Sequence, residues 1–182
     1  SVPADEAVAF AQTLLDHPDV EPIGLGARDS LRLEAGLCHN GHDIDQTTTP
    51  AEAGLSWAIQ KVRRSGGDRA GGFPGADRIL AEISGGAARK RVGFLPSGRA
   101  PMREGVPLFA DEAATVPIGT VTSGGFGPTV GVPVAMGYVP AAHAASGTVI
   151  YGELRGKRQP LTITKLPFTP ATFNRYSSEE DQ

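Results

Sequence analysis

Short β-rich runs punctuated by glycine and proline fill the chain from residue 89 onward, and this pattern constrains the fold more than any other feature. Runs of this length and spacing are typical of antiparallel sandwiches and barrels, in which strands end at turn residues. The Arg-Gly-Lys-Arg sequence at 155–158 indicates a hairpin turn between the last two runs. We therefore predict an antiparallel β domain in the second half of the chain. Its strands are expected at residues 91–95, 118–122, 132–139, 148–154 and 161–166.

Three helices are predicted upstream of the β-rich half by their apolar spacing and their end signals. In the first of them, Val8 and Leu15 belong to an apolar face with three- and four-residue spacing. Gly36 follows the second helix and is a typical stop, because glycine readily adopts the left-handed conformation that ends helices. The predicted helices cover residues 3–15, 27–35 and 75–83.

A glycine-rich segment separates the first two helices from the β-rich half. Residues 66–72 hold four glycines and two charged side chains, which is typical of an exposed linker. We therefore place a domain boundary within residues 65–88 and expect one lobe over residues 1–75 and another over residues 76–182. Helices followed by a separate antiparallel β domain define an α+β fold class.

The charge balance and the cysteine count exclude several classes of partner. A net charge of −3 argues against nucleic-acid binding, because nucleic-acid-binding proteins usually carry a marked basic excess. No stretch approaches the roughly 18 uninterrupted apolar residues of a membrane span. The single cysteine, Cys38, fits a reducing compartment. We expect neither nucleic acid nor a membrane as a partner, and the cytosol or an organelle matrix as the location.

Two segments resemble ligand sites but are better explained as turns. Residues 39–45 crowd two histidines and two aspartates together, yet their Asn-Gly pair is a strong turn signal and no second cluster of metal ligands exists elsewhere. Residues 123–129 are rich in glycine like a phosphate-binding loop, but they lack its lysine and its following helix. A turn between strands is predicted there. The residue pattern alone therefore predicts no metal site and no self-sufficient catalytic site.

A series of short motifs runs in order along nearly the whole chain. The most specific is Gly-Leu-Gly-Ala-Arg-Asp-Ser-Leu-Arg-Leu-Glu-Ala-Gly-Leu at residues 24–37. Each motif alone is weak, whereas their order and spacing together are specific. The others lie at residues 41–45, 49–57, 91–94, 101–103, 118–124, 135–139 and 166–168. On these motifs the chain resembles the C-terminal half of the glycine cleavage T-protein (aminomethyltransferase) family.

The resemblance implies a tetrahydrofolate-dependent aminomethyltransferase. Enzymes of this family take an aminomethyl group from the lipoyl arm of a carrier, the H-protein. They release ammonia and leave the one-carbon unit as methylenetetrahydrofolate. The family fold is a three-lobed ring with folate in its central opening, and its last lobe is an antiparallel barrel or jelly roll. Residues 1–75 would then be an incomplete α+β second lobe that contacts folate, and residues 76–182 the barrel lobe. The expected location is a bacterial cytoplasm or the mitochondrial matrix.

Arg28 matches the family arginine that contacts folate. At the start of a short helix, its planar guanidinium can present two donors to a carboxylate or carbonyl oxygen. A surface position, or an ion pair with Asp29 or Glu34, is the alternative interpretation. Arg32 and Glu34 belong to the same motif and are equally consistent with bracing the helix.

A second folate contact in the family is a tyrosine that follows a Pro-Phe-x-Pro segment. That segment is present here at residues 167–170, and the matching position is Phe173, which keeps an aromatic ring but has no hydroxyl. Tyr176 lies three residues later and is the alternative contact. The sequence leaves both possibilities open.

The resemblance also implies what the chain lacks. Family members place a catalytic aspartate and a folate-binding glutamate before the position that matches Ser1. We therefore expect a missing N-terminal half as a partner, no catalytic residue in this chain, and no activity of the chain alone. The alternative is a non-catalytic folate-binding lobe of another ring-fold protein, either a demethylating oxidase or an iron–sulfur maintenance factor.

Overall fold

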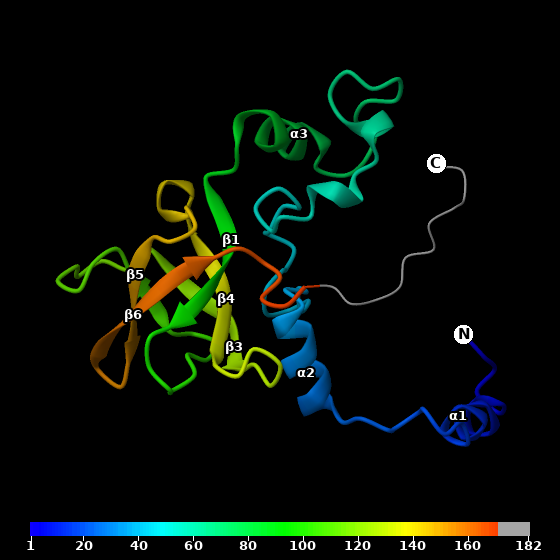
Figure 1. The fold of residues 1–182 in the computed structure, drawn as a ribbon. Helices are drawn as coiled ribbons and strands as arrows, with labels where there is room; N and C mark the ends of the chain where they lie inside the picture. Colours follow the sequence, from blue (N-terminus) through cyan, green and yellow to red (C-terminus); the bar gives the residue numbers. More distant parts are fainter. Residues whose placement is uncertain (171–182) are drawn as a thin grey trace, which may run out of the picture.

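The computed structural model describes residues 1–170, and within them it places three α-helices beside one β-barrel (Figure 1). The helices are α1 (Ala7–Leu15), α2 (Leu25–Glu34) and α3 (Ala76–Gly85). Three short 3-10 helices are η1 (Ser56–Ala58), η2 (Lys61–Arg63) and η3 (Ala141–His143). The strands are β1 (Arg89–Pro96), β2 (Pro107–Phe109), β3 (Gly119–Phe126), β4 (Pro133–Pro140), β5 (Val149–Leu154) and β6 (Lys157–Thr164). Within residues 1–170, no helix has the length and hydropathy needed to cross a bilayer. The predicted fold class is confirmed.

The six described strands close into a barrel in the order β1-β4-β3-β2-β5-β6, and each neighbouring pair is antiparallel. Alternate residues of a strand point to one side, so β5 and β6 bury Ile150, Leu161 and Ile163 inside the barrel. Phe94 of β1 and Leu108 of β2 belong to the same core, and neither has any exposed surface. The interior of the barrel therefore forms the larger of the two hydrophobic clusters in the described residues.

All five predicted β-runs are strands, and β2 is a strand that the sequence does not predict. It is only three residues long, which is too short for a pattern of alternating burial to be recognised. Its Leu108 pairs with Gly119 of β3 on one side and with Gly152 of β5 on the other, so it closes the barrel. The predicted hairpin turn is confirmed but has two residues, since Arg155 and Gly156 both have positive φ and β6 begins directly after them.

The prediction of a turn over residues 123–129 is wrong for its first half. Residues 123–126 continue β3 and pair with β4 as far as Pro133. Close packing explains the glycines: a Cβ at Gly124 would lie 1.7 Å from the carbonyl oxygen of Met102. Glycine here allows two backbone segments to approach each other and does not mark a turn.

The three predicted helices are present, with shifted ends. Residues 4–6 form a turn, and α1 begins at Ala7 after its N-cap Glu6, whose side chain makes no capping hydrogen bond. The predicted stop after α2 is confirmed, since Gly36 has a φ of +66°. A Cβ at Gly36 would also lie 3.0 Å from the Leu166 Cβ, so the helix ends against the C-terminal segment.

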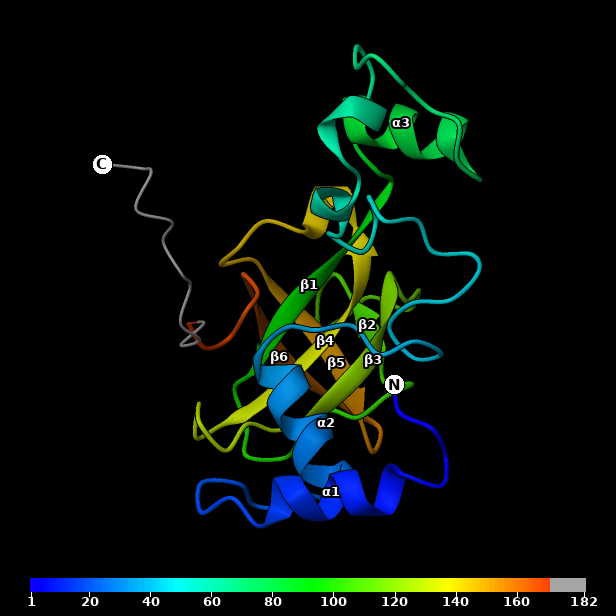
Figure 2. The same cartoon turned by 90° about the vertical axis from the view of Figure 1, so that its right-hand side faces the viewer.

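Helix α2 lies between α1 and the barrel in Figure 1, and Figure 2 shows it in front of β3 and β4. Its Leu33 is buried against Val134 and Met136 of β4. Helix α1, in contrast, buries no residue within the described part of the chain, and Val8 and Phe10 are 81% and 51% exposed. The apolar face predicted for α1 is therefore solvent-exposed, and α2 is the helix that packs on the barrel.

A buried carboxylate connects α3 and β1 to the segment after α2. The backbone N–H of Glu52 donates to Thr49 Oγ1 (3.1 Å), and the Thr49 N–H donates to Glu52 Oε2 (3.0 Å), which is a reciprocal capping pair. Arg78 of α3 and Arg89 of β1 donate to Glu52 Oε1 at 3.2 and 3.1 Å. Burial alone would raise the pKa of Glu52, but the hydrogen bonds from Arg89 and Thr49 and the charges of both arginines hold this pKa below its usual range.

We expect Glu52→Gln to lower the free energy of unfolding at neutral pH by about 1–2 kcal/mol, less than for a fully buried pair because both arginines are partly exposed. Folding lowers the pKa of Glu52, so its stabilisation is present at neutral pH and is lost as the pH falls through the folded-state pKa. Urea unfolding should show that the difference in the free energy of unfolding between the parent and Glu52→Gln decreases as the pH falls. Glu153→Gln, which alters a more exposed carboxylate paired with Arg158, is the control and should change little. A difference that stays constant in acid would refute this account.

Candidate functional site

Arg28 lies in the first turn of α2, which begins at Leu25 with Gly24 in an extended conformation before it. The Arg28 side chain is exposed and makes no hydrogen bond or ion pair with any residue in 1–170. The two acids considered as alternative partners are occupied elsewhere. Asp29 accepts from Arg32 at 2.6 Å, and Glu34 accepts from backbone N–H groups of the loop after β3. Arg28 is therefore available to an external anion or carbonyl oxygen.

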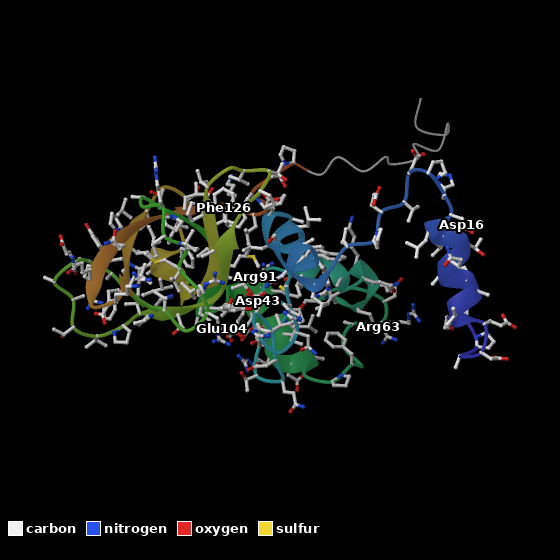
Figure 3. The ribbon with its side chains drawn as sticks, turned by 90° about the horizontal axis from the view of Figure 1, so that it is seen from below. Asp16, Asp43, Arg63, Arg91, Glu104 and Phe126 are labelled. Carbon is white, nitrogen blue, oxygen red and sulfur yellow. The ribbon has the colours of Figure 1, made fainter. Side chains whose placement is uncertain are left out.

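Asp43 is the buried centre of a polar network between α2 and β3. Its side chain has 0% exposure and accepts from Arg32 Nη1 at 2.6 Å and from the His39 N–H at 2.9 Å. The hydroxyls of Thr122 and Ser123 donate to the same carboxylate. Figure 3 shows Asp43 where α2 meets the barrel, far from Asp16 at the end of α1. The network fixes α2 to the barrel wall.

Residues 39–45 form the polar turn that the sequence predicts. The N–H groups of His42 and Asp43 donate to the His39 carbonyl, and the His39 and His42 rings stack with centroids 4.7 Å apart. His42 Nδ1 lies 2.6 Å from Glu104 Oε2. The sequence does not predict that the Asp43 of this turn is the partner of Arg32. Spacing along the chain does not show it, because the hydroxyls that share the Asp43 carboxylate, those of Thr122 and Ser123, are distant along the chain.

The C-terminal end of α2 holds two further segments. Glu34 Oε1 accepts from the N–H groups of Thr129 and Val130, each at 2.7 Å. The Glu34 carbonyl accepts from the N–H groups of Phe168 at 2.9 Å and Thr169 at 3.3 Å. Arg32 and Glu34 thus brace the helix, which is the structural role that the sequence analysis considered for them. Phe173 and Tyr176, the two candidates for the second folate contact, lie outside the described residues.

Two clefts flank α2. One, of about 530 Å³, lies at its C-terminal end and includes Trp57, which is 76% exposed, and Arg91, whose guanidinium donates to the carbonyls of Gly36 and Ala53. The other, of about 280 Å³, is polar and is lined by two residues of α2, Asp29 and Arg32, but not by Arg28. Its lining includes Asp29, Arg32, His39, His42, Arg103 and Glu104. Arg28 lines neither of these two clefts, and it remains a candidate for contact with a ligand because it lies in the motif at residues 24–37, is exposed and has no partner within residues 1–170.

Two family models match the chain. The glycine cleavage T-protein C-terminal barrel domain matches residues 89–169, which contain all six described strands. The GCVT N-terminal domain matches residues 1–63, which contain α1 and α2.

Relatives named mitochondrial aminomethyltransferase are similar over almost the whole chain. The protein from Gallus gallus is 49% identical over 173 residues, which are 95% of this chain and 42% of the relative. The one from Homo sapiens is 46% identical, over 95% of this chain and 41% of the relative. The crystal structure of glycine cleavage system aminomethyltransferase T from Bartonella henselae has a TM-score of 0.83 at 49% identity, covering 92% of this chain and 45% of that chain. The chain thus spans about two fifths of the length of these relatives.

A helix seated on a closed barrel of this kind defines the class, an α+β protein with the C-terminal barrel of a glycine cleavage T-protein. The chain belongs to the glycine cleavage T-protein family, which confirms the resemblance found in its motifs. Mitochondrial relatives and a bacterial structure are both similar to it, so the two expected locations are each consistent with these comparisons.

Proposed function

We propose that the full-length protein containing this chain is the aminomethyltransferase of the glycine cleavage system. By full-length protein we mean one with the length of the relatives, of which this chain covers about two fifths. It would transfer the one-carbon unit from an aminomethyl-lipoyl group on the H-protein to tetrahydrofolate, with release of ammonia. The observation that carries this proposal is Arg28, which lies in the family motif, is exposed and has no partner within residues 1–170.

The chemistry assigns this chain a binding role. The guanidinium of Arg28 would donate to a carboxylate or carbonyl oxygen of tetrahydrofolate, and charge-assisted bonds of this kind are stronger than neutral ones. Asp29 and Asp43 are both paired with Arg32, and the Asp43 side chain is not exposed, so neither is free to exchange a proton with a bound amine. On the resemblance to the family, we propose that the catalytic carboxylate of the reaction comes from outside this chain.

We further propose that residues 1–75 form part of the folate-contacting lobe and residues 76–182 the barrel lobe. The glycine-rich residues 66–72 support this division, since Gly66, Gly71 and Gly72 all have positive φ. The family models on either side, at residues 1–63 and 89–169, leave this segment unmatched. The Phe173 contact stays a proposal on the resemblance alone, with Tyr176 as its alternative.

Stabilisation by ligands tests the proposed substrate. Tetrahydrofolate at about 100 times its Kd should stabilise the full-length protein by about 2.7 kcal/mol, because it binds only the folded state. A flavin at the same concentration should not change the free energy of unfolding. This result would distinguish the proposed transferase from a demethylating oxidase. The names of the relatives favour the transferase. Stabilisation by flavin and not by tetrahydrofolate would favour the oxidase instead.

A further inference from the structure

One carboxylate in the described part of the chain is enclosed and yet supplied with many donors. The Asp43 side chain has 0% exposure. Its donors come from Arg32 in α2, from the N–H of His39 in the following turn, and from the hydroxyls of Thr122 and Ser123 in β3. Asp43 therefore joins α2, the turn after it and the barrel wall at one point.

This junction gives α2 directional contacts that bear on its rotation about its own axis, which apolar packing leaves less defined. Leu33 packs on Val134 and Met136, and hydrophobic contacts of this kind are non-directional. The pair of Arg32 and Asp43 is directional, since Nη1 lies 2.6 Å from Oδ2 and the planar guanidinium fixes the direction of its bonds. Glu34 adds directional bonds at the C-terminal end of α2, and the ion pair sets the side that faces the barrel at Arg32, one turn from Arg28.

Arg28 precedes Arg32 by four residues, about one helical turn, so the two arginines lie on the same side of α2. Within residues 1–170, Arg28 has no contact that would fix its own direction, so its direction depends on the rotation of the helix. We propose that Asp43, acting through Arg32, is a positioning residue that aims Arg28 at tetrahydrofolate. This inference rests on the proposed folate contact of Arg28.

The energetics of buried ion pairs support a positioning role. Such a pair adds little net stability, because desolvation offsets much of the attraction between its charges. Some buried pairs instead select one arrangement of the elements that they join. Asp43→Asn keeps the size of the side chain but leaves the Arg32 guanidinium, whose side chain is 11% exposed, without its buried anion. The orientation of α2, and with it that of Arg28, should then be less well defined.

The test is a double-mutant cycle in the full-length protein, read as the Kd and KM for tetrahydrofolate. Asp43→Asn should raise both about tenfold and change kcat at saturating tetrahydrofolate by less than about twofold, because a uniform binding contact is weakened. In an Arg28→Ala background, Asp43→Asn should cause no further loss, because the positioned group is already absent. Ser123→Ala removes the hydrogen bond that Arg32 donates to the hydroxyl and the one that the hydroxyl donates to Asp43, and it should give a smaller loss with the same dependence on Arg28. This variant carries the test if Asp43→Asn does not fold.

Glu52→Gln is the matched control, because it also removes a buried negative charge that is paired with arginine. Glu52 bonds to Arg78 and Arg89 but to no residue of α2. Glu52→Gln should leave the Kd unchanged in both backgrounds. If the Asp43 and Ser123 variants weaken binding equally with and without Arg28, or have no effect, the positioning role is overturned while the Arg28 contact stands. If Arg28→Ala itself leaves the Kd unchanged, the folate contact fails, and the positioning role fails with it.

Discussion

The 182-residue chain on its own is expected to form no methylenetetrahydrofolate from tetrahydrofolate and aminomethyl-lipoylated H-protein. Two carboxylates of the region around α2, Asp29 and Asp43, are both paired with Arg32. General acid–base catalysis needs a group within hydrogen-bond reach of the proton that it transfers, and neither of these is free for that role. The chain also covers only about two fifths of the relatives with the proposed activity.

This expectation is measured by mixing the purified chain with saturating concentrations of both substrates and following the absorbance of the folate product. The full-length protein under the same conditions is the positive control. A rate clearly above the uncatalysed one from the chain alone would show that residues 1–182 contain a catalytic group, and the assignment of a binding role to this chain would be wrong.

Arg28→Ala in the full-length protein should weaken tetrahydrofolate binding by about 1.5–3 kcal/mol, or roughly 10- to 150-fold in Kd. The reason is the loss of a charge-assisted hydrogen bond to an exposed guanidinium that has no partner within residues 1–170. Arg28→Lys should recover only part of the affinity, because an ammonium lacks the planar pair of donors.

Isothermal titration calorimetry measures this effect directly. Arg99→Ala, which removes another exposed arginine in the loop after β1, is the control and should bind tetrahydrofolate like the parent. Equal affinity of the parent and Arg28→Ala would show that Arg28 does not contact tetrahydrofolate. The contact on which the proposed function rests would then be absent.

Most of the fold could be predicted from the sequence because strands and helices leave periodic patterns. The alternating burial of β6, with Leu161 and Ile163 inside, is visible in the sequence, and so is the glycine stop after α2. β2 is too short to show a period. The sequence wrongly predicts a turn at Gly124, because close approach of two backbones and a tight turn favour the same residue.

Some residues of the candidate site could likewise be identified from the sequence, and others could not. Arg28 could be found because it lies within a continuous motif that resembles a known family. The role of Asp43 could not, because its hydroxyl partners, Thr122 and Ser123, lie about 80 residues further along the chain and meet it only once the barrel has formed. The exposure of α1 was also unpredictable, since an amphipathic pattern shows which face is apolar but not what covers it.

The most direct test of the proposed function is the stoichiometry of the full-length protein with aminomethyl-lipoylated H-protein and tetrahydrofolate. The account predicts that ammonia and methylenetetrahydrofolate form together in a one-to-one ratio, and that omitting either substrate abolishes the enzyme-dependent rate of methylenetetrahydrofolate formation. A protein that binds tetrahydrofolate but forms no methylenetetrahydrofolate from the loaded H-protein, or that instead oxidises dimethylglycine or sarcosine, would contradict it.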